Sequence, residues 1–595
     1  MASYPFYLLC TVLCLLAYPV YLTTCNLQTA RRLGLPVIIT PLTWQSNLWQ
    51  PLAPLFSFIQ HIPILGSWYR YSLFSWTFDD AGRTNERLGS AVAIVSPFPL
   101  EIILADPLAS QDVFMKWKEY IKPGDIYKIF EVFGPNSNTV NGQDWMRHRK
   151  IGSIGFCEAN CKIVWKEGIR QAESMIALFN QGDEVNSADV DLKTMQDNIN
   201  LLAMHVLMAA GFGREYDFGP EGLKKDEPGF SMSYGHSLEV LLRNILFTIL
   251  FSTLKAPEWL LPTTLRELKT ARGAFMKHME AKVQEEKDAF AQEKNGSGES
   301  HLGDTLVASL VRANEKAKEE SDASLRFVLN DEELFGNIFI YNLAGFETTS
   351  TQLTYSLPLL AANPDVQDWI REEIDDVMSR TSSYEEAYPQ LVRTLAVMYE
   401  TLRLYGAVQQ LPRTCPSPTP LRLKSTTLDL PPHTLVSINL PALHRSPAFW
   451  GPDANEWKPK RWIRVLASEA QLNGNDHDEG RAKKTKQRGS ATHATTRSDG
   501  TVEVLDGAGP DGESFVAWLN GPRMCPGRKF SQVEFVSVLV AVVRGWRIEV
   551  GEGMGGGDGE TRRRLQRVVQ DSTFNLTPKI REPRAGKVRF VRRER

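Results

Sequence analysis

Apolar residues recur at helical spacing along most of the chain, whereas stretches that alternate apolar and polar residues are few. Residues 331–353, 391–406 and 529–546 carry this pattern clearly. The first of these segments opens with an acidic turn directly after Asn330, a residue type that favours the start of a helix. The periodicity therefore predicts a mainly α protein with long helices and few strands.

The N-terminal residues 6–24 contain no charged residue and are long enough to cross a bilayer as a helix. Arg31 and Arg32 follow them and no Lys or Arg precedes them, which favours a cytoplasmic C-terminal body. We expect an uncleaved signal-anchor transmembrane helix at residues 1–25. A cleaved signal peptide is the alternative, although it usually has a basic start. Residues 26–60 are then expected to form a membrane-proximal linker.

Two further segments depart from the general pattern. Residues 238–254 are very apolar but include Glu239 and Arg243, so a second span competes with a buried or membrane-touching helix. Residues 467–512 are rich in Gly, Ser, Thr, Asp, Lys and Arg and have almost no large apolar residues. Such a segment cannot bury enough surface to offset its ordering entropy, so we predict a disordered insertion.

Composition narrows the classes of function. The 595 residues carry a net charge of -3 without a concentrated basic stripe, and nothing predicts nucleic-acid binding. Seven scattered cysteines do not resemble a disulfide framework. Cys157 and Cys161 have a CxxxC spacing, but the second ligand pair of a structural zinc site is missing.

The most specific motif surrounds one late cysteine: Gly521, Arg523, Cys525 and Gly527 form the pattern G-x-R-x-C-x-G. A lone thiolate can serve as the axial ligand of heme iron. Glycines let the backbone pass close to a flat macrocycle, and Arg523 can pair with a heme propionate. The start of the helix predicted after Cys525 lowers the pKa of a thiol. A buried structural cysteine is the alternative.

These residues resemble the heme-binding signature of the cytochrome P450 family, the heme-thiolate monooxygenases. Trp518 stands where the family usually has Phe and keeps an aromatic ring beside the cysteine. Glu400 and Arg403 match the family's ExxR motif, and Arg461 lies in a segment that resembles P-x-R-W, with Lys460 in place of the usual acidic residue. The resemblance implies that Glu400, Arg403 and Arg461 form a buried charge network behind the heme.

The resemblance covers residues 61–595 as one catalytic domain. It implies a single large helical domain with a small β-rich subdomain, in which heme b lies between a distal helix and the helix after the cysteine. Trp145 and Arg149 resemble the pair that holds the heme propionates, with Arg147 and His148 as alternatives for that contact.

The segment AGFETTS resembles the family's distal helix. Ala344 and Gly345 imply room above the iron for dioxygen, and Gly345 can let the helix open locally. Thr348 implies a hydrogen bond to bound oxygen or to the water that protonates it, and Glu347 implies a proton relay. Heme supplies the difficult chemistry, and the protein supplies orientation and protons. The acid–alcohol pair favours insertion of one oxygen atom of O2. The alternatives are rearrangement or dehydration by the same fold, and a non-catalytic membrane heme sensor or carrier.

About 70 residues follow Cys525, too few for a flavin or nicotinamide domain. We therefore expect NADPH-derived electrons to come from a separate protein. By resemblance this partner is the membrane-bound NADPH-cytochrome P450 reductase, with cytochrome b5 as a second candidate. The residues predicted to form a basic docking face are Arg147, Lys150, Arg528 and Lys529.

The stretches predicted to line the substrate site are residues 126–140, 335–343, 407–411 and Phe574. They are mostly apolar, as ligand pockets generally are, with Gln409 and Gln410 as the exceptions. We expect a lipophilic or weakly polar small molecule as substrate. The long insertion is fungal in style, so we expect a secondary-metabolite hydroxylase. By resemblance it is a single-pass protein of the endoplasmic reticulum membrane with a cytosolic catalytic domain.

Overall fold

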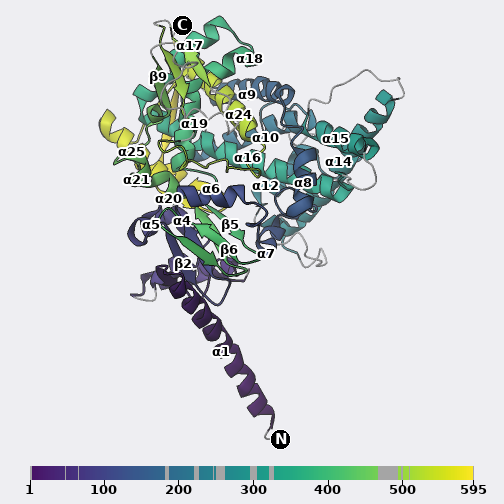
Figure 1. Ribbon diagram of the computed structural model, residues 1–595. Coiled ribbons are helices and arrows are strands. Elements are labelled where there is room, and N and C mark those ends of the chain that lie inside the picture. Colours follow the sequence, from purple (N-terminus) through teal and green to yellow (C-terminus); the bar gives the residue numbers. More distant parts are fainter. Residues whose placement is uncertain are drawn as a thin grey trace.

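A computed structural model describes residues 3–46, 48–63, 66–180, 187–219, 227–245, 247–248, 261–294, 305–320, 327–466, 493–497, 500–507 and 509–593. Helices dominate the described chain, as predicted (Figure 1). The longer helices are α1 (Ser3–Arg32), α9 (Glu158–Phe179), α10 (Leu192–Phe212), α12 (Tyr234–Arg243), α14 (Thr263–Lys294), α15 (Leu306–Glu320), α16 (Asp331–Ala362), α17 (Pro364–Arg380), α19 (Val392–Leu404), α24 (Arg528–Gly545) and α25 (Asp558–Gln570).

Helix α16 runs through the middle of the helical body (Figure 1) and packs against α10, α19 and α24. It begins at the predicted residue, because the Asn330 side chain accepts the N–H of Glu333 at 2.8 Å. The Glu333 carboxylate in turn accepts the N–H of Asn330 at 2.9 Å, which completes a capping box. The predicted helices at residues 391–406 and 529–546 are confirmed by α19 and α24.

A five-stranded sheet forms the β-rich part beside α1 (Figure 1). Its strands, in spatial order, are β1 (Val37–Ile39), β2 (Ala91–Val95), β3 (Glu101–Leu104), β8 (Leu435–Asn439) and β5 (Gln410–Thr414). The pairs β1–β2 and β3–β8 are parallel, whereas β2–β3 and β5–β8 are antiparallel. Strand β5 is the element that follows α19 in the chain, so it connects this helix to the sheet.

Smaller sheets join distant parts of the chain. Strand β15 (Lys587–Arg592) lies between β12 (Trp546–Val550) and β4 (Ser187–Asp191), and β6 (Thr419–Arg422) pairs with β7 (Thr427–Leu430). Strands β13 (Ser572–Phe574) and β14 (Pro578–Ile580) form an antiparallel hairpin near the C-terminus. This hairpin reaches back to α16, where the Tyr355 hydroxyl donates to Ser572 at 2.8 Å.

The N-terminal helix is longer than predicted, and its C-terminal end belongs to the folded body. Ala30 is fully buried against β2, and the Asn26 side-chain amide donates to the carbonyls of Ser96 and Phe98 at 2.9 and 2.8 Å. No helix among the described residues combines the length and apolar character needed to cross a membrane, so the predicted transmembrane helix is not supported. Residues 26–60, predicted as a membrane-proximal linker, contain the end of α1, β1, α2 (Trp49–Leu52) and most of η1 (Ala53–His61).

The predicted disordered insertion contains structure at its C-terminal end. Strand β11 (Val502–Leu505) lies between β9 (Ile463–Leu466) and β10 (Ala494–Thr496). Val502 and Val504 are buried, and Glu503 forms a buried ion pair with Arg393 of α19 at 2.7 Å. Residues 467–492 lie outside the described residues. The prediction was therefore wrong for β10 and β11, because the low average apolarity of the segment hid one short apolar strand.

The apolar residues 238–254 fall only partly within the described chain. Helix α12 covers their start and buries Leu238, Leu241 and Leu242 in the main core. This is the predicted buried helix, whereas residues 249–254 lie outside the described residues.

Candidate functional site

Cys525 lies in the loop that leads into α24. Its N–H donates to the carbonyl of Trp518 at 2.9 Å. Gly521 has φ +70°, and a Cβ there would lie 2.7 Å from the carbonyl oxygen of Phe114, so the loop requires glycine at this position. A Cβ on Gly527 would lie 3.9 Å from the Cys525 sulfur, an ordinary contact distance. Of the two predicted glycines, the backbone therefore requires Gly521.

Burial raises the pKa of the Cys525 thiol and is the largest effect on it. The backbone N–H of Gly527 and the guanidinium groups of Arg149 and Arg528 act in the opposite direction. We expected the start of the following helix to lower the pKa of this thiol, but burial has the larger effect and raises it. Within the described part of the chain, no group of three or more His, Cys, Asp and Glu side chains could hold a metal ion, so the spacing of Cys157 and Cys161 gains no support as a zinc site.

Trp518 occupies the position where the sequence pattern usually has Phe, and its indole nitrogen has a specific role. The indole N–H donates to the Ser531 hydroxyl at 3.3 Å, a bond that Phe cannot make. The ring lies 5.1 Å from the Tyr399 ring, and the Arg528 guanidinium lies 5.2 Å above it. Arg528 also donates to the Tyr399 hydroxyl at 2.9 Å. Trp518 thus ties the cysteine loop to both α24 and α19.

Three buried cations lie together beside the cysteine loop: Lys122, Arg413 and Arg523. Burial lowers the pKa of Arg523 to about 9, and Arg413 acts in the same direction. Burial also lowers the pKa of Lys122, and both arginines add to that effect. None of the three forms an ion pair with a carboxylate of the described residues, although Arg523 donates to the Val140 carbonyl at 3.0 Å and to the Asn141 side chain at 2.9 Å.

The Nε and Nη1 atoms of Arg523 are buried and have no hydrogen-bond partner. Unpaired buried charges are costly, so this cluster fits an anionic group with acceptor oxygens directed at Arg523. The propionate groups of heme have this chemistry, and the residues present therefore fit the predicted cofactor. Sequence reasoning identified Arg523 but missed Lys122 and Arg413, because no local motif distinguishes them from surface cations.

Trp145 and Arg149 project from α8 (Gly142–Gly152), one helical turn apart. The Trp145 ring is buried, lies 4.5 Å from the Trp117 ring and has the Arg523 guanidinium 4.6 Å above it. Burial lowers the pKa of Arg149, whereas Tyr341 and Cys525 act in the opposite direction. Trp145 of the predicted pair therefore packs against the arginine of the cysteine loop, and Arg149 lies one helical turn further along α8.

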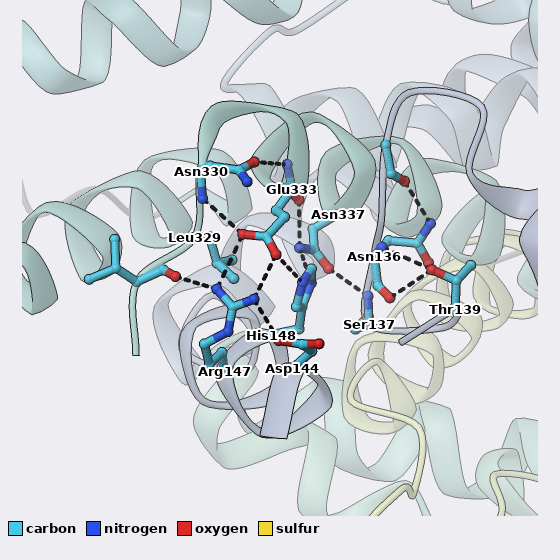
Figure 2. A network of polar contacts seen from close by, with 12 residues as sticks. Asn136, Ser137, Thr139, Asp144, Arg147, His148, Leu329, Asn330, Glu333 and Asn337 are labelled. Carbon is cyan, nitrogen blue, oxygen red and sulfur yellow. Dashed lines mark hydrogen bonds and ion pairs between the residues drawn. The ribbon is translucent and has the colours of Figure 1, made fainter. Parts of the chain in front are cut away.

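The two alternatives on α8 have other partners (Figure 2). Arg147 donates to Glu333 of α16 and to Asp144, each at 2.8 Å. The His148 ring lies 2.7 Å from the side-chain nitrogen of Asn337 on α16 and 3.4 Å from Glu333. Arg147 and His148 therefore connect α8 to the start of α16, which leaves Arg149 as the arginine of this helix that is available to the cofactor.

The same network holds the chain segment that precedes α8. The Asn337 side-chain oxygen accepts the N–H of Ser137 at 3.0 Å (Figure 2). A Cβ on Gly336 would lie 2.3 Å from the carbonyl oxygen of Pro135, so the two backbones touch at this point. Residues 134–137, within the predicted substrate-lining stretch 126–140, are thereby fixed on α16 by backbone contact and a hydrogen bond.

Ala344 and Gly345 differ from each other in their surroundings. Ala344 is exposed although it lies in the middle of a largely buried helix, and the helix continues through both residues without a break. A Cβ on Gly345 would lie 3.2 Å from the Leu207 side chain of α10. Gly345 therefore serves the packing of α16 on α10, and Ala344 is the small residue on the open side. The predicted local opening at Gly345 is not present.

Glu347 and Thr348 point to different partners. The Thr348 hydroxyl donates to the Ala344 carbonyl at 2.8 Å, within the helix. One oxygen of Glu347 accepts a hydrogen bond from the Thr577 hydroxyl at 2.8 Å and lies 3.7 Å from the Lys579 ammonium. In this structure no hydrogen bond joins Glu347 to Thr348, so a proton relay between them requires a rotation of the Glu347 side chain.

Glu400 and Arg403 lie fully buried on α19 and form the predicted network. Arg403 donates to both oxygens of Glu400, at 2.8 and 2.9 Å. Three further groups donate to the same carboxylate. They are the Arg461 guanidinium at 3.0 Å, the backbone N–H of Lys458 at 2.7 Å and the indole N–H of Trp462 at 3.0 Å. The carboxylate thus receives five hydrogen bonds, and the structure brings together all three residues expected here.

His444 connects this network to the cysteine loop. Its carbonyl accepts a hydrogen bond from Arg403 at 2.8 Å, and its Nε2 accepts the N–H of Val516 at 3.1 Å. Burial lowers the pKa of His444 to about 3, with Arg403 and Arg445 acting in the same direction. The ring is therefore neutral and available as an acceptor for the backbone that leads to Cys525.

The four residues of the predicted docking face all have partners within the protein. Arg147 is paired with Glu333, and Arg528 is bonded to Tyr399, as described above. Lys529 forms an ion pair with Glu158, and Lys150 lies 4.3 Å above the Phe327 ring. Two of these four cations therefore have a carboxylate partner, and the docking face itself stays a prediction.

The two glutamines in the predicted lining stretches are bonded inside the protein. The Gln410 side chain donates to the buried Glu101 at 2.7 Å, and the Gln409 side chain donates to the Gly406 carbonyl. Phe574, predicted to line the site, is buried with its ring 5.8 Å from Phe78. This stretch therefore offers fewer polar contacts to a substrate than its sequence indicates.

Comparisons with known proteins point to one family. The family profile described as "Cytochrome P450" matches residues 60–472, more than half of the chain, and ends before Cys525. A cytochrome P450 monooxygenase of Penicillium rubens, prx9, is 28% identical over 572 residues, which are 91% of this chain and 91% of that protein. A cytochrome P450 monooxygenase of Arthrobotrys oligospora is 27% identical and covers 89% of each chain. The phomenoic acid biosynthesis cluster cytochrome P450 monooxygenase of Leptosphaeria maculans is 25% identical over 87% of this chain and 88% of its own.

Proposed function

The chain belongs to the cytochrome P450 family and is a monooxygenase, and from this premise we propose that it inserts one oxygen atom of O2 into a lipophilic small molecule of fungal secondary metabolism. One observation carries the proposal. The half-buried Cys525 thiol and the Arg523 guanidinium, two nitrogens of which have no hydrogen-bond partner, lie in the loop before α24, and α24 packs against the acid–alcohol helix α16.

When bound, heme supplies activation of dioxygen at its iron. Cys525 would hold the iron, and Arg523, Lys122 and Arg413 would hold the propionates, with Trp145 packed against Arg523. The propionates would supply the counter-charge that Lys122, Arg413 and Arg523 otherwise lack among the described residues.

The residues of the distal helix orient the substrate and move the proton. Ala344 keeps the open side of α16 small, which leaves room for a substrate. The Thr348 hydroxyl can turn from the Ala344 carbonyl to donate toward the reacting oxygen, and Glu347 replaces the proton that it gives up. Oxygen insertion needs this proton supply, whereas a heme carrier does not.

Three observations support a lipophilic substrate. The predicted lining stretches are mostly apolar, and both Gln409 and Gln410 are bonded inside the protein. The relatives are fungal, and one is named for a phomenoic acid biosynthesis cluster.

A reductase that delivers NADPH-derived electrons, with cytochrome b5 as a second donor, is part of the proposal. So is a location at the endoplasmic reticulum membrane, which rests on the uncharged residues 6–24.

The first test is the difference spectrum of the reduced protein with carbon monoxide, followed by turnover with NADPH and a reductase over a panel of lipophilic compounds. A thiolate-type Soret shift and an oxygenated product are expected. A normal shift without any product across the panel would overturn the enzymatic proposal in favour of a heme sensor or carrier.

The second test addresses the proton supply. The variant Thr348→Ala is expected to consume NADPH and release hydrogen peroxide while it loses product. An unchanged amount of product per NADPH would show that Thr348 has no part in proton delivery.

A further inference from the structure

The C-terminal hairpin of β13 and β14 contacts the predicted proton relay directly. Thr577 lies between the two strands and is buried, and its hydroxyl donates to Glu347 at 2.8 Å. The Thr351 hydroxyl, one turn after Glu347 on α16, lies 3.2 Å from the same Thr577 oxygen and donates to the Glu347 carbonyl at 2.7 Å. The Glu347 carboxylate is therefore held by residues about 230 positions away in the sequence.

Lys579 of β14 marks the solvent end of this arrangement. Its ammonium lies 3.7 Å from the Glu347 carboxylate, and its side chain is 45% exposed while that of Glu347 is 14% exposed. The carboxylate thus sits between a buried hydroxyl and a solvated cation. This position faces away from Thr348, whose hydroxyl is bonded to Ala344.

A small polar cavity adjoins the carboxylate. Its volume is about 20 Å3, and its lining includes Gln196 and Asn200 of α10, Thr351 and Thr354 of α16, and Glu347 itself. A cavity of about 10–15 Å3 suffices for one water when two to four polar groups are in reach. Gln196 and Asn200 are both partly exposed, so the cavity lies close to the outer surface of α10.

We propose that this cavity holds the water that returns protons to Glu347, and that Thr577 and Lys579 are positioning residues that keep the carboxylate at the cavity between turnovers. The inference rests on the proposed monooxygenase function and adds the outer half of its proton route. The C-terminal hairpin thereby becomes part of the supply of protons to the active site.

The transfer balances without any oxidant or reductant. A proton passes from solvent to the cavity water and from that water to a Glu347 oxygen. The carboxyl group then rotates about its side-chain torsions and gives the proton to the Thr348 hydroxyl, which has donated its own. Glu347 and Thr348 return to their starting states, and the net event is the movement of one proton.

The hydroxyl of Thr577 is tested by Thr577→Val, which keeps the shape of the side chain. The variant is expected to lower product formed per NADPH by roughly threefold to tenfold, the size that follows from the loss of one hydrogen bond. It should also increase the solvent kinetic isotope effect on turnover, because proton return becomes slower. The matched control is Thr573→Val, which lies on the same hairpin but makes no hydrogen bond to Glu347. Binding of substrate, measured by its spectral shift, should be unchanged in both variants.

The cation is tested by Lys579→Met, with Arg581→Met as control because Arg581 pairs with Asp571 at 3.1 Å. Because the Lys579 ammonium is solvated and lies 3.7 Å from the carboxylate, Lys579→Met is expected to change the product-to-NADPH ratio by less than about threefold. A larger effect than that of Thr577→Val would overturn the assignment of Thr577 as the main positioning residue.

The water itself is tested without turnover. A high-resolution crystal structure of the resting, substrate-free protein is expected to show an ordered water in the cavity, within hydrogen-bond distance of Glu347. The variant Asn200→Leu should displace this water and lower coupling, whereas Asn200→Gln should keep both.

A dry cavity in the parent protein, or unchanged coupling and isotope effect in Thr577→Val and Asn200→Leu, would overturn the inference. These results are distinct from failure of the proposed function, because in that case the parent protein itself would form no product.

Discussion

The buried network at Glu400 gives a quantitative prediction for the variant Glu400→Gln. One oxygen of Glu400 accepts hydrogen bonds from Arg403, Lys458 and Arg461, and the other accepts from Arg403 and Trp462. A glutamine fits the same space but replaces one acceptor oxygen by an NH2 donor. In its better orientation the NH2 group faces the two donors of the second oxygen, so two hydrogen bonds are lost.

The charge adds to this cost. Arg403 is fully buried, and Glu400 is its acidic partner at 2.8 Å. Removing one partner of a buried ion pair costs about 3–5 kcal/mol, because the other charge stays buried and unpaired. We therefore expect Glu400→Gln to lower the free energy of unfolding by about this amount and to reduce the yield of heme-loaded protein.

The measurement is denaturation by guanidinium chloride, followed by circular dichroism on the parent protein and the variant under the same conditions. The control is Glu372→Gln. Glu372 pairs with Arg393 at 3.2 Å, but its side chain is 71% exposed. Such a pair is worth about 0–1 kcal/mol. If Glu400→Gln came within about 1 kcal/mol of the parent, or cost no more than the control, the reasoning from buried charge would be wrong.

Three other variants test other parts of the structure. Arg523→Leu is expected to weaken heme retention by roughly tenfold or more, measured by transfer of heme to a heme-scavenging protein. The unfolding midpoint of the apoprotein should stay equal or rise, because a buried cation without a carboxylate partner among the described residues is gone. A destabilised apoprotein would contradict this. Glu503→Gln should cost about 3–5 kcal/mol in denaturation, since Glu503 pairs with the buried Arg393 at 2.7 Å, whereas a disordered insertion predicts no loss. Burial raises the pKa of Glu101 to about 7, so the folded chain binds this proton more tightly than the unfolded chain and stability falls as pH rises from about 4.5 to about 7. Glu101→Gln should remove about 3 kcal/mol of that fall, and an unchanged pH dependence of unfolding would refute the assignment.

Much of the fold and the centre of the site follow from local sequence. The long helices are found where helical periodicity places them, and α16 begins after Asn330 because the capping box is encoded within four residues. The cysteine motif and the ExxR pair are likewise short, and their residues lie close together in the structure because the chain itself holds them close.

Predictions that rested on average composition or on a single small residue were wrong. The strand Val502–Leu505 was hidden by the polar residues around it, and its place against Arg393 depends on a partner 110 positions away. Gly345 looked like an opening above a cofactor, but the side that its missing Cβ faces is set by the packing of α10.

The sequence by itself determined the chemistry that the chain carries: one thiol in a glycine-rich loop, an acid–alcohol pair on a helix, and charged residues at fixed helical spacing. Only the tertiary structure decided which charges are satisfied. It left Arg523 without partners for two of its nitrogens, gave Arg147 to Glu333, and turned Glu347 toward Thr577. The physical reason is that a hydrogen bond or ion pair depends on a distance of about 3 Å and on burial. Between residues far apart in the chain, both are properties of the packed helices and not of any local pattern.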